Sequence, residues 1–106
     1  MVHGDVVVFD QLDLVGAAAS ANPGFLGYQL FPTARYTIAA MRGDRAIKVS
    51  VGFNPWCGAA RTHDIGALCE ALGGGGHAVV GGVTLRLDET SRARAATASL
   101  VAALTS

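Results

Sequence analysis

The chain has 106 residues, of which 51% are hydrophobic and 15% are charged, and eight basic and eight acidic residues give a formal net charge of +0. A chain of this length fits a single domain, and its apolar composition excludes a disordered tail. The balanced charge argues against a protein that binds polyanions through bulk charge, so recognition of a phosphate would need a local site.

No run of residues approaches the roughly 20 consecutive apolar positions that cross a bilayer, and residues 1–5 lack the basic leader of a secretory signal. We therefore expect a cytoplasmic protein with no membrane partner. The two cysteines, Cys57 and Cys69, are too few for a disulfide scaffold and do not form a CxxC pair. Cys69 is expected to be a small buried hydrophobe.

The N-terminal third begins with a strand. Residues 5–9 are apolar and rich in β-branched side chains, which is typical of a strand buried on both faces. Residues 10–16 predict the start of a short helix, and the cluster at 22–24 is turn chemistry. Residues 25–32 hold three aromatic side chains and predict an irregular segment or short strand against the core.

The middle of the chain predicts an antiparallel hairpin. Side chains alternate in character along residues 34–42 and 46–53, and a tight link at Gly43-Asp44 joins the two runs. Pro55 marks the end of the second strand, because proline cannot continue a central ladder.

A helix follows the hairpin. Ile65, Leu68, Cys69 and Leu72 are spaced i, i+3, i+4 and i+7, which predicts one apolar helical stripe. Thr62 is the expected N-cap, with Asp64 in the first turn. Gly73 is expected to end the helix by taking a positive φ.

The last third predicts a strand at residues 83–87 and a final amphipathic helix with its cap within 88–91. The apolar stripe of that helix consists of Ala93, Ala96, Leu100, Val101 and Leu104. This element order predicts an α/β or α+β fold: a single mixed sheet of about four to five strands with a central antiparallel hairpin, flanked by two or more helices.

Four consecutive glycines, Gly73, Gly74, Gly75 and Gly76, precede His77. Each ordered glycine costs roughly 0.5–1 kcal/mol relative to alanine, and a short helix-to-strand link needs only one. The excess predicts bare backbone whose N–H groups wrap an anion, with the His77 imidazole as an added donor. The alternative is a mobile connector. The run matches neither GxGxxG nor the P-loop.

Arg61 and His63 flank the start of the predicted helix, and the glycine run follows its end. At 1.5 Å per residue the helix is about 15 Å long, so the two ends are not expected to contact one phosphate. They could instead hold the two ends of a longer ligand, such as a dinucleotide. The alternative is that Arg61 is a solvated surface charge.

The sequence Gly-Gly-Gly-Gly-His-Ala-Val-Val-Gly-Gly at residues 73–82 resembles the DHH-associated C-terminal domain of DHH-family phosphoesterases. That group includes RecJ exonucleases, oligoribonucleases and exopolyphosphatase-like proteins. The family resemblance extends to four other segments, at residues 22–25, 28–32, 48–52 and 64–68. In all it covers residues 5–87. The whole chain, residues 1–106, is therefore expected to be one such substrate-binding domain.

The resemblance implies a division of labour between two lobes. In the family, the glycine-rich loop of this lobe holds the phosphate or terminal nucleotide, while a DHH lobe supplies Asp and His ligands for two Mn²⁺ ions that activate water. The residues that match as substrate contacts are Gly73, Gly74, Gly75, Gly76 and His77, with Arg61 as a less specific match. The implied ligands are short RNA or DNA, a nucleotide or another phosphorylated small molecule.

The catalytic half of such an enzyme is absent from this sequence. It has three histidines, no Asp-His-His triplet and scattered acidic residues, which predicts no metal site and no catalytic residue. We expect no hydrolysis by this chain alone, and Mn²⁺ only in a partner DHH lobe, in cis or in trans.

Two other functions stay open. The hairpin at 34–53 could present an open strand edge to a second copy or another partner, giving a non-catalytic interaction or dimerisation module. Trp56 would suit such a contact, although a partly buried core aromatic is the expected state. The second of these alternatives is a small enzyme with Cys57 as its nucleophile, although no base for it is identifiable nearby in the sequence.

Overall fold

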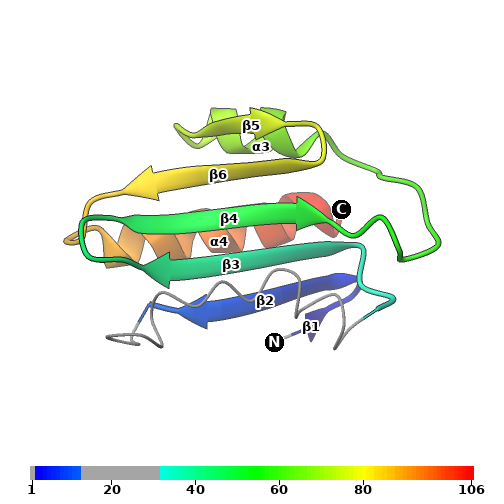
Figure 1. Ribbon diagram of the computed structural model, residues 1–106, viewed down its shortest axis with the longest axis horizontal. Helices are drawn as coiled ribbons and strands as arrows, with labels where there is room; N and C mark the ends of the chain where they lie inside the picture. Colours follow the sequence, from blue (N-terminus) through cyan, green and yellow to red (C-terminus); the bar gives the residue numbers. More distant parts are fainter. Residues whose placement is uncertain (1, 13–31) are drawn as a thin grey trace.

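The computed structural model describes residues 2–12 and 32–106, which form a six-stranded sheet and two helices (Figure 1). The elements are β1 (Val2–His3), β2 (Val6–Gln11), β3 (Tyr36–Arg42), β4 (Ile47–Phe53), α3 (Ile65–Ala71), β5 (Gly75–His77), β6 (Val80–Leu85) and α4 (Thr90–Leu104). The spatial order of the strands is β1-β2-β3-β4-β6-β5. The predicted α+β class is confirmed, with six strands in place of four to five.

The sheet is mixed because β2 and β3 are parallel while the other neighbours are antiparallel. The predicted hairpin is confirmed as β3 and β4, whose turn is closed by Gly43 N donating to Ala46 O at 2.9 Å. β3 also pairs with β2, and β4 also pairs with β6. The expectation that this hairpin offers an open edge is therefore wrong.

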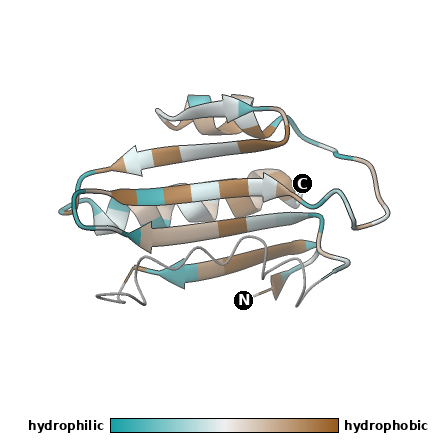
Figure 2. Cartoon of the chain, in the orientation of Figure 1, coloured by the Kyte–Doolittle hydropathy of each residue, from teal (hydrophilic) through white to brown (hydrophobic). Residues whose placement is uncertain are grey.

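Both helices cover one face of the sheet, as Figure 1 shows, and side chains alternate accordingly. Along β4, Ile47, Val49 and Val51 are buried in the core. In Figure 2, brown bands alternate with teal or white bands along this strand. The helices contribute Ile65, Cys69, Ala93, Leu100 and Leu104 to the same core. The i, i+3, i+4 spacing seen in the sequence thus produced both packed stripes.

Three predictions fall on the segment before β3. Residues 10 and 11 belong to β2, so a helix does not begin there. The turn expected at 22–24 and most of the segments at 10–16 and 25–32 lie outside the described residues. Among the residues that are described, neither helix combines the length and apolar character needed to cross a bilayer.

Candidate functional site

The glycine run was predicted to be a loop, but part of it is a strand. Gly75–His77 form β5, an edge strand antiparallel to β6, with the pairs Gly75–Gly82, Gly76–Gly81 and His77–Val80. The loop prediction is therefore wrong for these residues. These residues form a strand because the turn at residues 78 and 79 folds the glycine run back onto β6, which also contains glycines.

The first two amides of the run are already satisfied within the fold. Gly73 N donates to Glu70 O at 3.0 Å, and Gly74 N donates to Cys69 O at 2.8 Å. These bonds occupy carbonyls that the end of α3 would otherwise leave without partners. A cradle of free amides consequently does not form at Gly73 and Gly74.

Three of the four glycines are required by the fold itself. Gly73 has φ +89° and ends α3 as predicted. A Cβ on Gly74 would lie 2.1 Å from Gly82 O, and a Cβ on Gly76 would lie 2.4 Å from Gly81 Cα, at φ +146°. The expectation that this link needs only one glycine is therefore wrong, because the chain backbone packs too closely here for side chains.

Gly75 is the exception in the run. A Cβ at this position would have no heavy atom within 4 Å, and its φ is not positive. Strand alternation places Gly75 on the same face as His77, two residues away, and opposite the face that packs against α3. The fold therefore does not explain why Gly75 lacks a side chain, and both residues are exposed to solvent.

His77 lies at the beginning of α3, not at its end. Because β5 runs back along the helix, Ile65 N donates to Ala78 O at 3.1 Å, and a Cβ on Gly66 would lie 2.8 Å from His77 O. α3 has only seven residues. The inference that Arg61 and His77 lie at opposite ends of this helix is therefore wrong, since both lie at its N-terminal end.

The segment before α3 is anchored to the core through the buried hydroxyl of Tyr36. That oxygen accepts hydrogen bonds from Thr62 N at 2.8 Å and from His63 N at 3.0 Å. Asp64, not Thr62, caps the helix, because the Thr62 hydroxyl bonds with the Tyr36 hydroxyl while Asp64 Oδ1 accepts from Ala67 N. Arg61 is exposed, and its Nη1 donates to His63 O at 2.9 Å.

The face of β4, β6 and β5 turned away from the helices, which we call the open face, is exposed or half-buried throughout. By strand register it comprises Lys48, Ser50, Gly52, Gly75, His77, Val80, Gly82 and Thr84. The same side of the sheet over β2 and β3 is different, since Val7, Thr37 and Ala39 are buried. Accessible polar groups on this side therefore gather at the β5 end of the sheet.

Sequence reasoning missed Lys48 and Ser50 as site candidates. Their signal is the polar alternation along β4, which had predicted only a strand with one solvated side. The pairing of β4 with β6, and of β6 with β5, places these side chains on the same face as His77. Periodicity shows which side of a strand is polar, but it does not show which strands are neighbours.

An apolar groove of about 370 Å³ lies next to His77 at the end of β4. It is lined by Gly52, Phe53, Pro55, Val79 and Val80. Phe53 N donates to Val79 O at 2.9 Å, which ties the end of β4 to the turn after β5. The groove is therefore formed by the fold without a ligand, and a flat apolar group beside an anion could rest in it.

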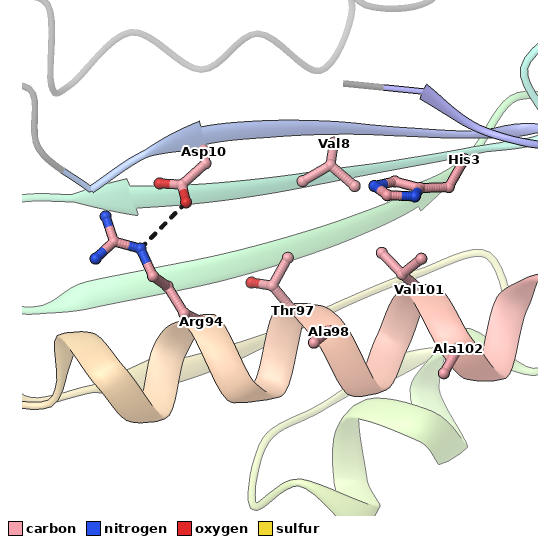
Figure 3. Close-up of a pocket in the computed structure, with 8 residues that line it drawn as sticks. All are labelled: His3, Val8, Asp10, Arg94, Thr97, Ala98, Val101 and Ala102. Atoms are coloured by element: carbon pink, nitrogen blue, oxygen red, sulfur yellow. Dashed lines mark hydrogen bonds and ion pairs between the residues drawn. The ribbon is translucent and has the colours of Figure 1, made fainter.

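A larger groove, of about 580 Å³, lies between β2 and α4 near the β1 edge of the sheet (Figure 3). At one end Arg94 Nε lies 3.3 Å from Asp10 Oδ2, and His3 lines the groove farther along. None of the predicted site residues lines it. Because its cation is paired with a carboxylate, this groove is a poorer match for an anion than the open face.

The described residues include two free cysteines but no cluster of metal-binding side chains. No group of three or more His, Cys, Asp or Glu side chains within 2–12 and 32–106 is placed to hold an ion. Cys69 is buried as expected, a Cβ on Gly81 would lie 2.9 Å from its Sγ, and burial raises the pKa of its thiol. Cys57 is a half-buried free thiol whose Sγ lies 3.5 Å from Ala59 O.

Solved structures that are similar to this chain include the following two. PggH from Vibrio cholerae, a pGpG-specific phosphodiesterase, is 26% identical with a TM-score of 0.71, and the match covers 98% of this chain and 35% of that one. The C-Ala domain of Aquifex aeolicus alanyl-tRNA synthetase is 15% identical with a TM-score of 0.57, covering 95% and 89% of the two chains. The second likeness shows the fold alone.

The chain thus spans about a third of the length of the PggH chain, 35%. No family model matches the sequence. No curated protein sequence matches it either.

Proposed function

We propose that this chain is the substrate-binding lobe of a DHH-type phosphoesterase. It holds the phosphate or terminal nucleotide of a short nucleic acid, or of a similar phosphorylated ligand, on the open face beside β5. The observation that carries the proposal is Gly75, the one glycine of the run whose missing side chain the fold does not require. A bare backbone position on an exposed face lets a ligand approach the main chain closely.

The likeness to PggH supports the choice of ligand class. It extends over nearly the whole of this chain, at 98% coverage, and PggH acts on pGpG. The open face supplies the matching chemistry: an imidazole at His77 that can donate to a phosphate, and an apolar groove beside it that suits a base. Arg61, at the same end of α3, adds a cation to this side of the site.

The proposed task of this lobe is binding, because no described residues fit the metal centre that phosphodiester hydrolysis by this family would use. Mn²⁺ would then be held by a DHH lobe, in cis or in trans, that faces the open face. Residues of this chain fix the phosphate, and the other lobe activates water.

Binding by calorimetric titration with pGpG tests the proposal. We expect His77→Ala to weaken binding about tenfold, as loss of a hydrogen bond to a charged group does. His3→Ala removes the same side chain from the opposite edge of the sheet and is expected to change nothing. Equal affinities of the two variants would overturn the assignment.

Gly75→Val tests the carrying observation separately. A valine on the open face would keep the ligand away from the backbone, so affinity should fall while thermal unfolding stays unchanged, since a Cβ there meets no atom within 4 Å. Unaltered affinity in a stable Gly75→Val variant would remove the reason for placing the ligand at β5.

The interaction-module alternative keeps one supporting observation. Its open hairpin edge does not exist, but Trp56 is 66% exposed, where a partly buried core aromatic had been expected, and Val79 and Val80 are each 50% exposed. A sizing experiment separates the two functions: a stable dimer that is indifferent to pGpG favours the module over the binding lobe.

A further inference from the structure

Lys48 is a cation on the open face that makes no ion pair with the other residues that the structure describes. It lies in the centre of β4 between Ile47 and Val49, which are buried, while its own side chain is exposed. Of the ion pairs formed within residues 2–12 and 32–106, all involve other basic residues. Its charge is therefore available to a ligand on this face.

The side chain of Lys48 extends toward Gly82 of β6. Its Cε lies 3.4 Å from the place that a Cβ on Gly82 would occupy. Gly82 is the β6 partner of Gly75. Because neither glycine has a side chain, nothing on this pair separates the end of Lys48 from a ligand lying over β5.

His77 and the end of Lys48 therefore flank a bare patch made by Gly75 and Gly82. Strands are about 4.8 Å apart and residues two apart on one strand face are about 6.8 Å apart. One step of each kind separates the Gly82 position from His77, which gives roughly 8 Å. Two successive phosphates of a short nucleotide chain can span such a separation.

We propose that Lys48 is a second anion contact, and that the site takes a ligand bearing two phosphate groups, with the internal phosphate at His77 and the 5′-phosphate at Lys48. This rests on the proposed function and adds to it the number of anionic groups recognised. The apolar groove beyond His77 favours a dinucleotide with a 5′-phosphate over an inorganic phosphate chain.

Titrations of the 106-residue chain with pGpG, with GpG, which lacks the 5′-phosphate, and with tripolyphosphate test this, at several salt concentrations. For Lys48→Met we expect about three- to fivefold weaker binding of pGpG, typical of one exposed charge pair. The salt dependence, as the slope of log affinity against log salt, should fall by about one. Binding of GpG should change less than twofold.

Arg45→Met is the matched control, since Arg45 is an exposed cation in the turn between β3 and β4. It should leave affinity and salt slope as in the parent chain. The inference is overturned if Lys48→Met binds pGpG like the parent, if GpG weakens equally, or if Arg45→Met has the same effect.

The titrations distinguish an error in the Lys48 contact from an error in the proposed binding function. If His77→Ala loses pGpG while Lys48→Met keeps it, only the second contact is wrong. If the parent chain binds none of the three ligands, both proposals fail. If tripolyphosphate binds as tightly as pGpG and responds equally to Lys48→Met, the two-phosphate contact stands and the groove is not used.

Discussion

The two sides of β5 are built from the same residue type under opposite constraints. On the side that packs against α3, Gly76 leaves no room for a side chain and adopts φ +146°. On the open face, Gly75 has free space around it and an ordinary φ. A run of identical residues therefore combines positions that the fold requires with one that it does not. Only the second kind is evidence for a ligand.

The same contrast holds for polar groups. On the packed side, the hydroxyl of Tyr36 and the amides of Gly73 and Gly74 are all engaged in hydrogen bonds within the chain. On the open face, the side chains of Lys48 and His77 are exposed, and neither side chain forms an ion pair within the described residues. Engaged groups stabilise the fold, and free ones are the candidates for recognition.

Gly76→Ala should have the largest effect on stability. Its Cβ would meet Gly81 Cα at 2.4 Å in a backbone conformation that alanine rarely adopts. We expect the free energy of unfolding in urea to fall by about 2–4 kcal/mol, from backbone strain plus overpacking. A variant as stable as the parent chain would show that β5 and β6 do not pack as closely at Gly76 as described.

Alkaline pH should lower the free energy of unfolding by an intermediate amount, through the buried thiol of Cys69. Burial raises the pKa of the Cys69 thiol, so the folded chain holds that proton more tightly than the unfolded chain does. This contribution is fully present below the thiol pKa of the unfolded state and is lost as pH rises through the folded-state value. Unfolding free energies measured between neutral and alkaline pH should fall more steeply for the parent chain than for Cys69→Ala. Parallel pH profiles would contradict the burial of this thiol.

Gly75→Ala should have the smallest effect on stability. A methyl group there meets no atom within 4 Å and needs no unusual φ. We expect a change within about 0.5 kcal/mol, as for exposed positions elsewhere, measured in the same urea titrations as Gly76→Ala. A loss as large as that of Gly76→Ala would erase the distinction between the two sides of β5.

Local patterns in the sequence were sufficient to predict the secondary-structure elements that contain such patterns. The hairpin of β3 and β4 and the stripe of α4 follow from alternation and from i, i+3, i+4 spacing, and Gly73 ends α3 with the predicted positive φ. Each of these features depends on residues close together in the chain. Their physical causes are therefore readable without knowing the tertiary structure.

Features that depend on distant residues were mispredicted. β5 has no hydrophobic period of its own and exists because it pairs with β6. Thr62 loses its capping role to Asp64 because Tyr36, 26 residues away, bonds its hydroxyl. Of the candidate site, sequence reasoning named Gly75 and His77 but could not separate Gly75 from its neighbours, since only close packing against β6 distinguishes them.

An NMR titration of the ¹⁵N-labelled chain with pGpG tests the central claim most directly, because it maps where the ligand binds. The largest shifts are expected at the amides of Gly75, His77 and Gly82, with smaller ones at Lys48. Shifts confined to the groove between β2 and α4, at His3 and Thr97, or no shifts at millimolar pGpG, would contradict binding on the open face.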